Sequence, residues 1–339
     1  MRFKAKLTTD QVSVLCNVVA PMSKLQDSHR GAVLYLDPDF VRISCRSDSG
    51  ITCFAELSKL IFLEHRIESA ADNVIVCQVD LLSLKLALQS VISSGSHLHG
   101  NNNNNNTTIA NTSNSRRGSN PNVSQNHHHA APTMVHAMLA QQTVVLKLAK
   151  RNRLPCLCLD GHATDEGAVE IHQAIPIRIM RATEMQYHLP PQINTPNVQL
   201  ELPMDRPLRA VVDKLKSMGP HIFLEASMKG DLTIRLDHDG ASLACFYHNL
   251  QPRWEEPEDN HEEQPTTTMT IHSSCILKVD GTKFAQCLQW QQSHLATSSC
   301  LIAMVHNEML VLHIMLHPEQ FGFFTYYLPV YCLTDEDLQ

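Results

Sequence analysis

The sequence contains one strand-to-helix phrase twice, as CQVDLLSLKLALQSV at residues 77–91 and as KVDGTKFAQCLQWQQ at residues 278–292. In each copy a short apolar run ends in Val-Asp, and aspartate at that place is a preferred helix N-cap. Apolar residues then recur at the spacing of one helical face. They are Leu81, Leu84, Leu88 and Val91 in the first copy, and Phe284, Cys287 and Leu288 in the second. Each copy therefore predicts a strand that enters an amphipathic helix, capped by Asp80 or Asp280.

The same order of elements surrounds both copies. A helical spacing predicts one further helix ahead of each copy, one capped by Thr9 or Asp10 and ending near Pro21, the other covering residues 205–218. The apolar stripe of the second is Leu208, Val211, Val212, Leu215 and Met218. Strands are predicted at residues 2–7, 32–45 (two strands), 51–60, 73–79, 143–150, 154–160 and 169–180, and again at 198–203, 221–228, 231–237, 241–247, 268–279, 301–316 and 321–331. We infer an internal duplication with a period of about 200 residues.

Three stretches interrupt this pattern. Residues 94–133 are rich in Asn, Ser and His with almost no large apolar side chain, which predicts a disordered insert. Residues 251–267 are rich in Pro, Glu and Thr and predict a solvated acidic loop. Residues 183–197 hold three prolines and predict an extended linker. The two domains are therefore expected at residues 1–182 and 198–332, followed by an acidic tail at 333–339.

Length, hydropathy and cysteine use limit the class of protein. A chain of 339 residues can form two domains of ordinary size. No apolar run approaches the roughly 18 to 20 residues of a membrane span, and the first residues lack the apolar region of a secretory signal. The 11 cysteines follow no disulfide framework and are expected to be free, mostly buried thiols. We expect a soluble protein of the nucleus or cytosol.

The net charge of −7 is unevenly distributed. Six acidic residues lie in WEEPEDNHEE at 254–263 and three more at 335–337. Without these nine, 25 of the 34 acidic residues remain against 27 basic ones. The total charge therefore neither indicates nor excludes a polyanionic partner, and only the placement of the charges is informative.

Two copies of a unit with many strands and two helices predict an α+β fold, in which helices cover one face of a largely antiparallel sheet. The charged sides of these helices are then the informative surface. Basic residues lie off or beside the apolar stripes, namely Lys85, Arg206, Arg209, Lys214, Lys216 and Lys283. Two interpretations remain open: an ordinary solvated helix face, or a surface that contacts nucleic-acid phosphates without reading bases, since no aromatic residues are interleaved.

Catalytic and metal-binding motifs are scarce. His127 to His129 form a metal-like cluster, but they lie in low-complexity sequence without fixed geometry. Cys156 and Cys158 lie on one predicted strand without a second cysteine pair, so buried core thiols are expected. The chain holds no phosphate-binding loop, nucleophile elbow or zinc-protease motif. We expect no enzymatic activity, no cofactor and no metal.

In its order of segments the chain resembles the sliding clamps of the PCNA superfamily. The start MRFKAKL, the tandem strand-helix units, the proline-bearing linker and the strand TYYLP followed by acidic residues carry this likeness. Four segments resemble more closely the Hus subunits of the heterotrimeric nine-one-one checkpoint clamp. They are LYLDPDFVRISC (34–45), IPIRIM (175–180), VVDKLKSMG (211–219) and HIFLEASMKGDLTIRLD (221–237). The likeness covers nearly the whole chain except the Asn-rich and acidic inserts.

This resemblance implies a non-catalytic nuclear subunit of a DNA clamp that acts in the DNA damage checkpoint and in repair. Two paralogous subunits would complete a six-domain ring around double-stranded DNA, placed there by an ATP-dependent clamp loader and used by checkpoint and repair proteins. Helices line the hole of such clamps, so DNA-facing roles are implied for Lys24, Lys85, Arg206, Arg209, Lys214, Lys216 and Lys283. The helix predicted at residues 10–20 carries no Lys or Arg, so that part of the channel would be weakly charged.

The resemblance also implies two protein contact surfaces. Ring closure in the family pairs the strand ahead of the linker, here residues 170–180, with a strand in the second domain of a neighbour, here residues 241–248. The implied interface residues are Ile171, Ile175, Ile177, Ile179, Leu243, Cys245 and Tyr247. Pro176 suits an edge strand, although ordinary internal strands remain the alternative. Client peptides bind family clamps in a groove beneath the linker, at positions that match Met185, Tyr187, Tyr327, Leu328 and Pro329.

Two other binding functions compete with this one. A replicative clamp of the PCNA type would form a homotrimer and promote polymerase processivity, whereas a checkpoint clamp needs two different partners. A scaffold that does not bind DNA is the third hypothesis. The sequence shows no clear basic import signal, so nuclear entry would depend on partners.

Overall fold

The structure is a computed structural model that describes residues 1–26, 31–97, 143–162, 170–181, 184, 188–204, 208–238, 240–253, 273–334 and 337. Several sequence predictions lie outside these described residues. They concern most of the Asn-rich insert with its histidine cluster, most of the acidic loop, and the residues Met185, Tyr187 and Arg206.

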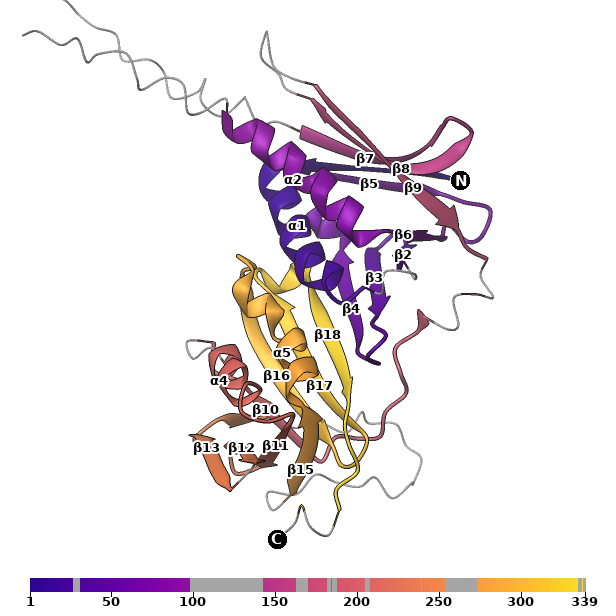
Figure 1. Cartoon of the computed structure of the whole chain (residues 1–339). Helices are drawn as coiled ribbons and strands as arrows, with labels where there is room; N and C mark the ends of the chain where they lie inside the picture. The colour runs from indigo at the N-terminus through magenta and orange to yellow at the C-terminus, as the bar shows by residue number, and fades with distance from the viewer. Residues whose placement is uncertain are drawn as a thin grey trace, which may run out of the picture.

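The described part of the first half runs strand, helix, five strands, helix and three strands (Figure 1). Its helices are α1 (Thr9–Ser23) and α2 (Leu81–His97). Its strands are β1 (Arg2–Thr8), β2 (Ala32–Leu36), β3 (Phe40–Arg46), β4 (Thr52–Ser58), β5 (Glu64–Glu68), β6 (Ile75–Val79), β7 (Thr143–Arg151), β8 (Leu154–His162) and β9 (Ile171–Ile179).

The second half repeats this order within its described residues. Its helices are α4 (Leu208–Leu215) and α5 (Gly281–Cys287). Its strands are β10 (Val198–Glu201), β11 (His221–Ser227), β12 (Asp231–His238), β13 (Ala241–Tyr247), β14 (Gln251–Pro252), β15 (Ser274–Asp280), β16 (Thr297–Val305), β17 (Met309–Leu316) and β18 (Gly322–Pro329).

The duplication extends to the order of the strands within each group of neighbours. The first half orders its strands β4-β3-β2-β6 and then β9-β8-β7-β1-β5, and the second half repeats this as β13-β12-β11-β15 and β18-β17-β16-β10-β14. All of these ladders are antiparallel. The helices lie together on one side of the sheets in Figure 1, with α1 against α2 and α4 against α5. The predicted α+β fold with helices on one face is therefore confirmed.

Side-chain caps start the helices. Asp280 accepts hydrogen bonds from the backbone N–H groups of Thr282 (2.8 Å) and Lys283 (2.9 Å), as the sequence predicts. Asp80 caps α2 through the N–H of Ser83, at 2.8 Å. The prediction for α1 was wrong by one residue, because its N-cap is Thr8. That helix also continues through Pro21 to Ser23, since a proline so close to the end disturbs only the last turn.

The helices bury the stripes that the sequence indicates. Leu81, Leu84, Leu88 and Val91 of α2 and Phe284, Cys287 and Leu288 in and after α5 are all buried. Leu208, Val212 and Leu215 of α4 are buried and Val211 is partly buried. Met218, the last residue of that predicted stripe, is 46% exposed, because α4 ends at Leu215 and the chain turns away. None of the helices in the described part of the chain is long and apolar enough to cross a membrane.

Four details of the predicted elements needed correction. Strand β5 was not predicted, and its charged sequence EHRIE suits the edge position that it holds beside β1. Strand β14 was not predicted either; it pairs with β10 and places residues 251–252 of the predicted acidic loop in a sheet. The run at 301–316 is two strands, β16 and β17, joined by a short turn. Helix α2 reaches His97, four residues into the predicted Asn-rich insert.

The cysteines behave as free thiols. Of the 11, nine are buried, Cys245 is half-buried and Cys332 is exposed. Cys156 and Cys158 on β8 are among the buried ones, as expected for core thiols. Among the described residues, no three side chains of His, Cys, Asp or Glu come together to hold a metal ion.

The two halves meet through a single strand pair. β18 of the second half pairs antiparallel with β4 of the first, over six residue pairs from Gly322 opposite Leu57 to Tyr327 opposite Thr52. This pairing joins all strands of the first half and five strands of the second into one 14-stranded sheet, and β13-β12-β11-β15 form a separate sheet. The side chain of Tyr326 on β18 is fully buried, and one apolar core extends across the junction. We call this strand pair the domain joint.

The domain joint predicts a strong effect for Gly322→Ala. Gly322 has φ +131°, and a Cβ there would overlap the carbonyl oxygen of Glu56 on β4. Backbone cannot yield as a side chain can, so we expect a loss of about 3 kcal/mol or more in the free energy of unfolding. Gly240→Ala is the matched control, because Gly240 also has positive φ (+78°) but no atom lies within 4 Å of its added Cβ. It should lose only about 1–2 kcal/mol. Equal losses in denaturant unfolding would contradict this account of the joint.

Candidate functional site

The four helices α2, α1, α5 and α4 lie in one row along the molecule (Figure 1), which we call the column. In Figure 1, α2, α1, α5 and α4 follow one another down the left of the view, with the sheets on the other side. The side-chain amide of Asn17 on α1 donates to the carbonyl of His294 in the second half at 3.2 Å, so the column is tied together across the domains. Both halves therefore present their helices to the same side, the surface on which DNA contacts were predicted.

The column holds few basic side chains. Lys24, just after α1, and Lys214 on α4 are exposed, and Lys85 on α2 and Lys283 on α5 are half-exposed. On α2 the exposed Leu82 and Leu86 lie on either side of Lys85 in sequence, so this part of the surface is apolar as well as basic. As the sequence indicates, α1 contributes no Lys or Arg.

Arg209 differs from the solvated cation that the sequence analysis expected. Its side chain is only 13% exposed. The guanidinium binds Asp213 one turn later (3.0 Å) and donates to the carbonyl of Ala285 on α5 (2.9 Å). Its hydrogen-bonding groups are therefore used to hold α4 against α5.

Lys216 is also engaged, because its ammonium lies 2.6 Å from the second oxygen of Asp213. Partial burial acts to raise the pKa of Asp213, but the hydrogen bonds from Lys216 and Arg209 outweigh it and lower that pKa. The carboxylate thus stays charged and keeps both cations beside it. Lys214 remains the exposed cation of α4.

Strand β9 has one open edge. Its residues 171–176 pair with β8, whereas β6 pairs only with residues 177–179 on the other side. The N–H of Met180 donates to Val76 just beyond β6's ladder, at 3.0 Å. Because hydrogen-bonding direction alternates along a strand, the backbone groups of Pro176, Ala174 and His172 point to the same side, where the edge is open. Proline lacks an N–H, so a regular ladder with a further strand would have to end before Pro176.

The side chains on this edge are polar. His172, Gln173 and Ala174 are exposed. His172 Nδ1 lies 2.9 Å from Asp160, a nearly buried carboxylate that also binds Lys147. The hydrogen bond to Asp160, with a second to Glu170, raises the pKa of His172.

Strand β13 is the second open edge. Within the described residues it pairs only with β12, at the end of the sheet β13-β12-β11-β15. Its exposed side chains include two large apolar ones, Phe246 (61% exposed) and Leu243 (40% exposed). An exposed apolar edge is a place where another strand can be added.

The residues predicted for the subunit interface are only partly in suitable places. Leu243 is exposed, Ile171, Ile179 and Cys245 are half-buried, and Ile175, Ile177 and Tyr247 lie in the core of this chain. The sequence prediction chose apolar residues, but apolar residues in a half-buried strand face their own domain. The exposed residues His172, Gln173 and Phe246 were missed. Alternation within the strand was the signal for His172 and Phe246, whereas Gln173 shares the parity of the buried Ile175 and had no local signal.

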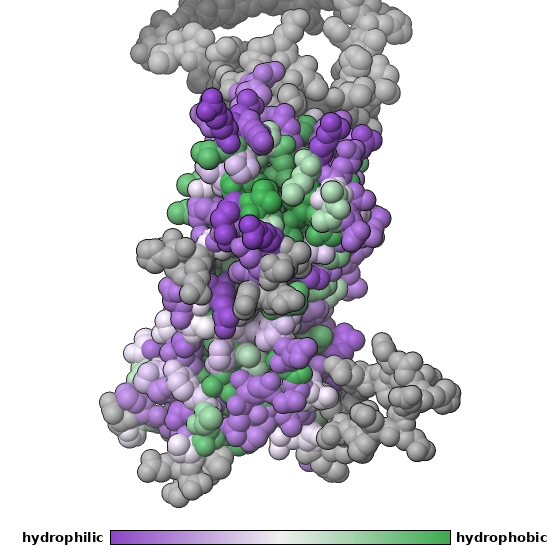
Figure 2. All heavy atoms as spheres, turned by 90° about the vertical axis from the view of Figure 1, so that its right-hand side faces the viewer, coloured by the Kyte–Doolittle hydropathy of each residue, from purple (hydrophilic) through white to green (hydrophobic). Residues whose placement is uncertain are grey.

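The opposite face of the molecule is formed by the sheets. Figure 2, turned to this side, shows apolar residues gathered in the upper half and hydrophilic residues around them. On the outward side of β2 and β6, Val33, Val76 and Met180 form a small cluster separate from the main core, with Tyr35 and Val74 packed against it.

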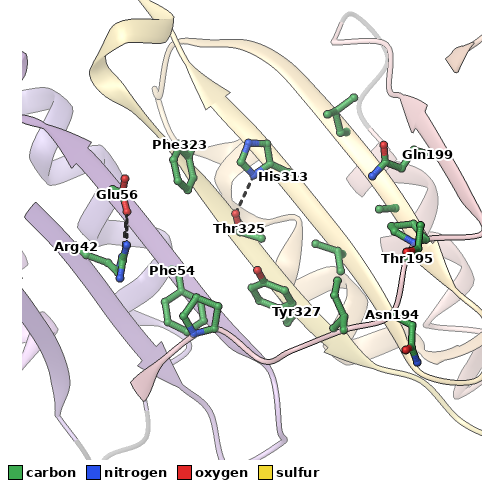
Figure 3. A pocket seen from close by; sticks show the side chains of 16 residues that line it. Arg42, Phe54, Glu56, Asn194, Thr195, Gln199, His313, Phe323, Thr325 and Tyr327 are labelled. Carbon is green, nitrogen blue, oxygen red and sulfur yellow. Dashed lines mark hydrogen bonds and ion pairs between the residues drawn. The ribbon is translucent and has the colours of Figure 1, made fainter. Parts of the chain in front are cut away.

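A groove of about 690 Å³ lies at the domain joint, beneath residues 190–196 of the linker. Figure 3 shows Phe54 and Glu56 from β4, Arg42 from β3, and Phe323, Thr325 and Tyr327 from β18 along its floor. The three β18 residues alternate in sequence, so they share one face of the strand. The groove is therefore mainly apolar and aromatic, with polar groups at particular points.

Two polar pairs lie in this groove. Arg42 binds Glu56 at 2.7 Å, and its guanidinium also lies over the ring of Phe40, 5.0 Å from the centroid. His313 Nδ1 lies 2.9 Å from the hydroxyl of Thr325. Burial lowers the pKa of His313, so this imidazole is neutral at neutral pH. An extended segment with apolar side chains suits such a surface.

The groove residues predicted from sequence need correction. Tyr327 lines the groove, but Leu328 is 1% exposed and belongs to the core, because adjacent residues of a strand face opposite ways. Pro329 is beside Gly50 and is not among the lining residues. The prediction missed Arg42 and Phe54, which lie on the neighbouring strands β3 and β4, and His313 on β17, which the domain joint brings to the same groove.

Comparison with known proteins identifies the family. The profile of the family described as Hus1-like protein matches residues 1–332. The Checkpoint protein hus1 homolog of Dictyostelium discoideum is 26% identical over 334 residues, which cover 97% of this chain and 98% of that relative.

Two further relatives align over shorter lengths. Checkpoint protein HUS1 of Homo sapiens is 25% identical over 178 residues, 50% of this chain and 61% of the relative. Checkpoint protein hus1 of Schizosaccharomyces pombe is 23% identical over 195 residues, 55% of this chain and 66% of the relative. The resemblance inferred from the sequence is thus confirmed, and the alternative of a homotrimeric replicative clamp is set aside. The chain belongs to the Hus1-like protein family, the checkpoint-clamp branch of the PCNA-like fold.

Proposed function

We propose that this chain is a non-catalytic subunit of a ring that encircles double-stranded DNA in the nucleus and supports the DNA damage checkpoint and repair. The observation that carries this proposal is the domain joint. In this joint the edge of β18 pairs with the edge of β4. The equivalent strand of β18 in the first half is β9, and that of β4 in the second half is β13; both of these keep an open edge. A chain with one open edge of each kind contacts a different neighbour at each end, and such head-to-tail contacts can close into a ring.

The duplication also predicts which residues lie opposite one another when β9 or β13 pairs with a strand of a neighbouring subunit. In the filled joint, Phe324 lies opposite Ala55. The residue pairs of each sheet can be compared between the two copies to find equivalent positions. By this comparison Ile171 on β9 is equivalent to Phe324 on β18, and Cys245 on β13 is equivalent to Ala55 on β4. These residues would therefore be central in the two joints with neighbours. The neighbours are two paralogous clamp subunits, as expected for this family.

Substitution of Phe246 by Glu tests the open edge of β13. Its side chain is 61% exposed, so the isolated chain should fold and melt almost normally. A charge in the joint should reduce assembly with the two paralogues at least about tenfold, measured by sizing after co-expression. Leu154→Glu, at a similarly exposed leucine (57%) on β8, is the matched control and should assemble normally. Normal assembly by the Phe246→Glu chain would contradict the proposed ring.

The column of helices is the proposed DNA-facing wall. Lys24, Lys85, Lys214 and Lys283 carry the phosphate contacts in this proposal, and Arg209 and Lys216 support α4 instead. Contacts of this kind are individually weak and screened by salt, which suits a ring that moves along DNA of any sequence. Enclosure then provides the residence time. An ATP-dependent loader is needed to open such a ring around DNA.

Replacing Lys85, Lys214 and Lys283 together by Gln tests this wall. Each lost phosphate contact should reduce the slope of log affinity against log salt concentration by about 0.9, so the assembled ring should lose DNA retention mainly at low salt. The control replaces Arg2, Lys4 and Lys6, which alternate with the buried residues of β1 and so lie on the opposite side of the sheet, and should leave the slope unchanged. An unchanged slope in the first variant would favour a scaffold that does not bind DNA.

The groove at the domain joint is the proposed site for checkpoint and repair proteins. Its aromatic floor and neutral His313 suit an extended client segment that buries apolar side chains. Tyr327→Ala should weaken capture of such proteins by the assembled ring about tenfold and leave DNA retention unchanged. Tyr331→Ala, at an exposed tyrosine outside the groove, is the control. Equal capture by both variants would place the client site elsewhere.

A further inference from the structure

The segment after β18 folds back onto the edge of β15. The N–H of Tyr331 donates to the carbonyl of Lys278 at 2.8 Å, and its ring meets the ring of His221 edge to face, 4.9 Å between centroids. In the first half, β6 and β9 pair over three residues at the corresponding place. In the second half only the isolated bridge between Lys278 and Tyr331 is formed. Other contacts of this segment therefore matter for how firmly it is held.

Three side chains provide such contacts, and we call them the tail clasp: Lys278, Thr334 and Asp337. The ammonium of Lys278 lies 2.6 Å from one oxygen of Asp337. The other oxygen of Asp337 accepts from the hydroxyl (2.8 Å) and the backbone N–H (2.9 Å) of Thr334. The hydrogen bond from Lys278, with those from Thr334, lowers the pKa of Asp337 to about 2. Both side chains of the Lys278–Asp337 pair are largely removed from solvent.

We propose that Thr334 is a phosphorylation site for an acidophilic protein kinase, and that its phosphate opens the tail clasp. In this reaction Thr334 Oγ1 attacks the γ-phosphorus of ATP, the bond from that phosphorus to the ADP oxygen breaks, and the hydroxyl proton passes to the kinase's catalytic carboxylate. The products are phosphothreonine and ADP.

The sequence around Thr334 supports recognition by such a kinase. Thr334 is exposed and lies outside helices and strands, so an active site can reach it once the tail clasp opens and releases Asp337. The next three residues are Asp335, Glu336 and Asp337. Kinases select substrates by charge pattern, and a basic substrate groove would bind three successive carboxylates well. Thr164 offers an internal comparison, because it is followed by Asp and Glu but then by Gly167.

The geometry of the clasp predicts the consequence. A phosphorylated Oγ1 has no proton, so its hydrogen bond to Asp337 is lost. The phosphate brings a charge of about −1.5 to −2 next to a carboxylate that remains ionised. Lys278 can neutralise only one of these charges, and like-charge repulsion within hydrogen-bonding distance expels Asp337. The segment after Tyr331 then loses its main attachment to β15.

The first test is phosphorylation of the full chain, alone and in the assembled clamp, by a kinase of the casein kinase 2 type with ATP, mapped by mass spectrometry. Thr334 should be modified, and Asp337→Asn should slow its modification at least about tenfold. Thr164 should stay unmodified. Failure to modify Thr334, or a rate that does not depend on Asp337, would overturn the recognition part of the proposal.

The second test is hydrogen exchange of the peptide that contains residues 330–337. The phosphorylated chain should exchange the amides of Tyr331 and Thr334 at least about tenfold faster than the unmodified chain, and Asp337→Asn should match it without phosphate. Thr334→Val keeps the pair between Asp337 and Lys278, so its exchange should rise much less. Unchanged exchange after phosphorylation would overturn the opening of the clasp.

Discussion

The antiparallel pairing of β18 with β4 is the constraint on which the rest of the structure depends. It joins two copies of one unit through backbone hydrogen bonds, with an apolar core that crosses the junction, so strands β10, β14 and β16–β18 continue the sheet of the first half. Continuity of the sheet in turn brings both pairs of helices to one side and places the groove on the other. Gly322 shows how closely the strands approach, since even a methyl group there would overlap a backbone oxygen.

A joint of this kind can be repeated. Each half holds two strands whose edges can pair with another unit, β4 and β9 in the first half and β13 and β18 in the second. Within the chain only β4 and β18 pair with each other. The two remaining edges differ in character, because β9 presents polar side chains and ends its ladder at Pro176, whereas β13 presents Phe246 and Leu243. Unlike edges favour head-to-tail contact over contact between two equal edges. The difference also gives each end of the chain its own chemistry for choosing a neighbour.

The basic residues on the helices divide by chemistry as well as by position. The planar guanidinium of Arg209 makes two directed hydrogen bonds and holds α4 to α5, a task that suits arginine. The lysines that remain exposed or half-exposed carry point charges on flexible stems, which suit contacts that form and break along a phosphate backbone. A small number of such charges fits a surface that holds DNA by enclosure more than by affinity.

The sequence by itself determined the duplication, the α+β class, the helix caps at Asp80 and Asp280 and the buried helix stripes, because these follow from local spacing. It also carried the family resemblance. The sequence did not predict the edge strands β5 and β14, which are charged or very short. These strands are held by pairing with their neighbours and have no apolar pattern of their own. Only the tertiary structure decided that Arg209 faces inward, that Leu328 is core, and that Arg42, Phe54 and His313 meet in one groove. Those outcomes depend on contacts between residues tens to hundreds of positions apart, and no local spacing encodes such contacts.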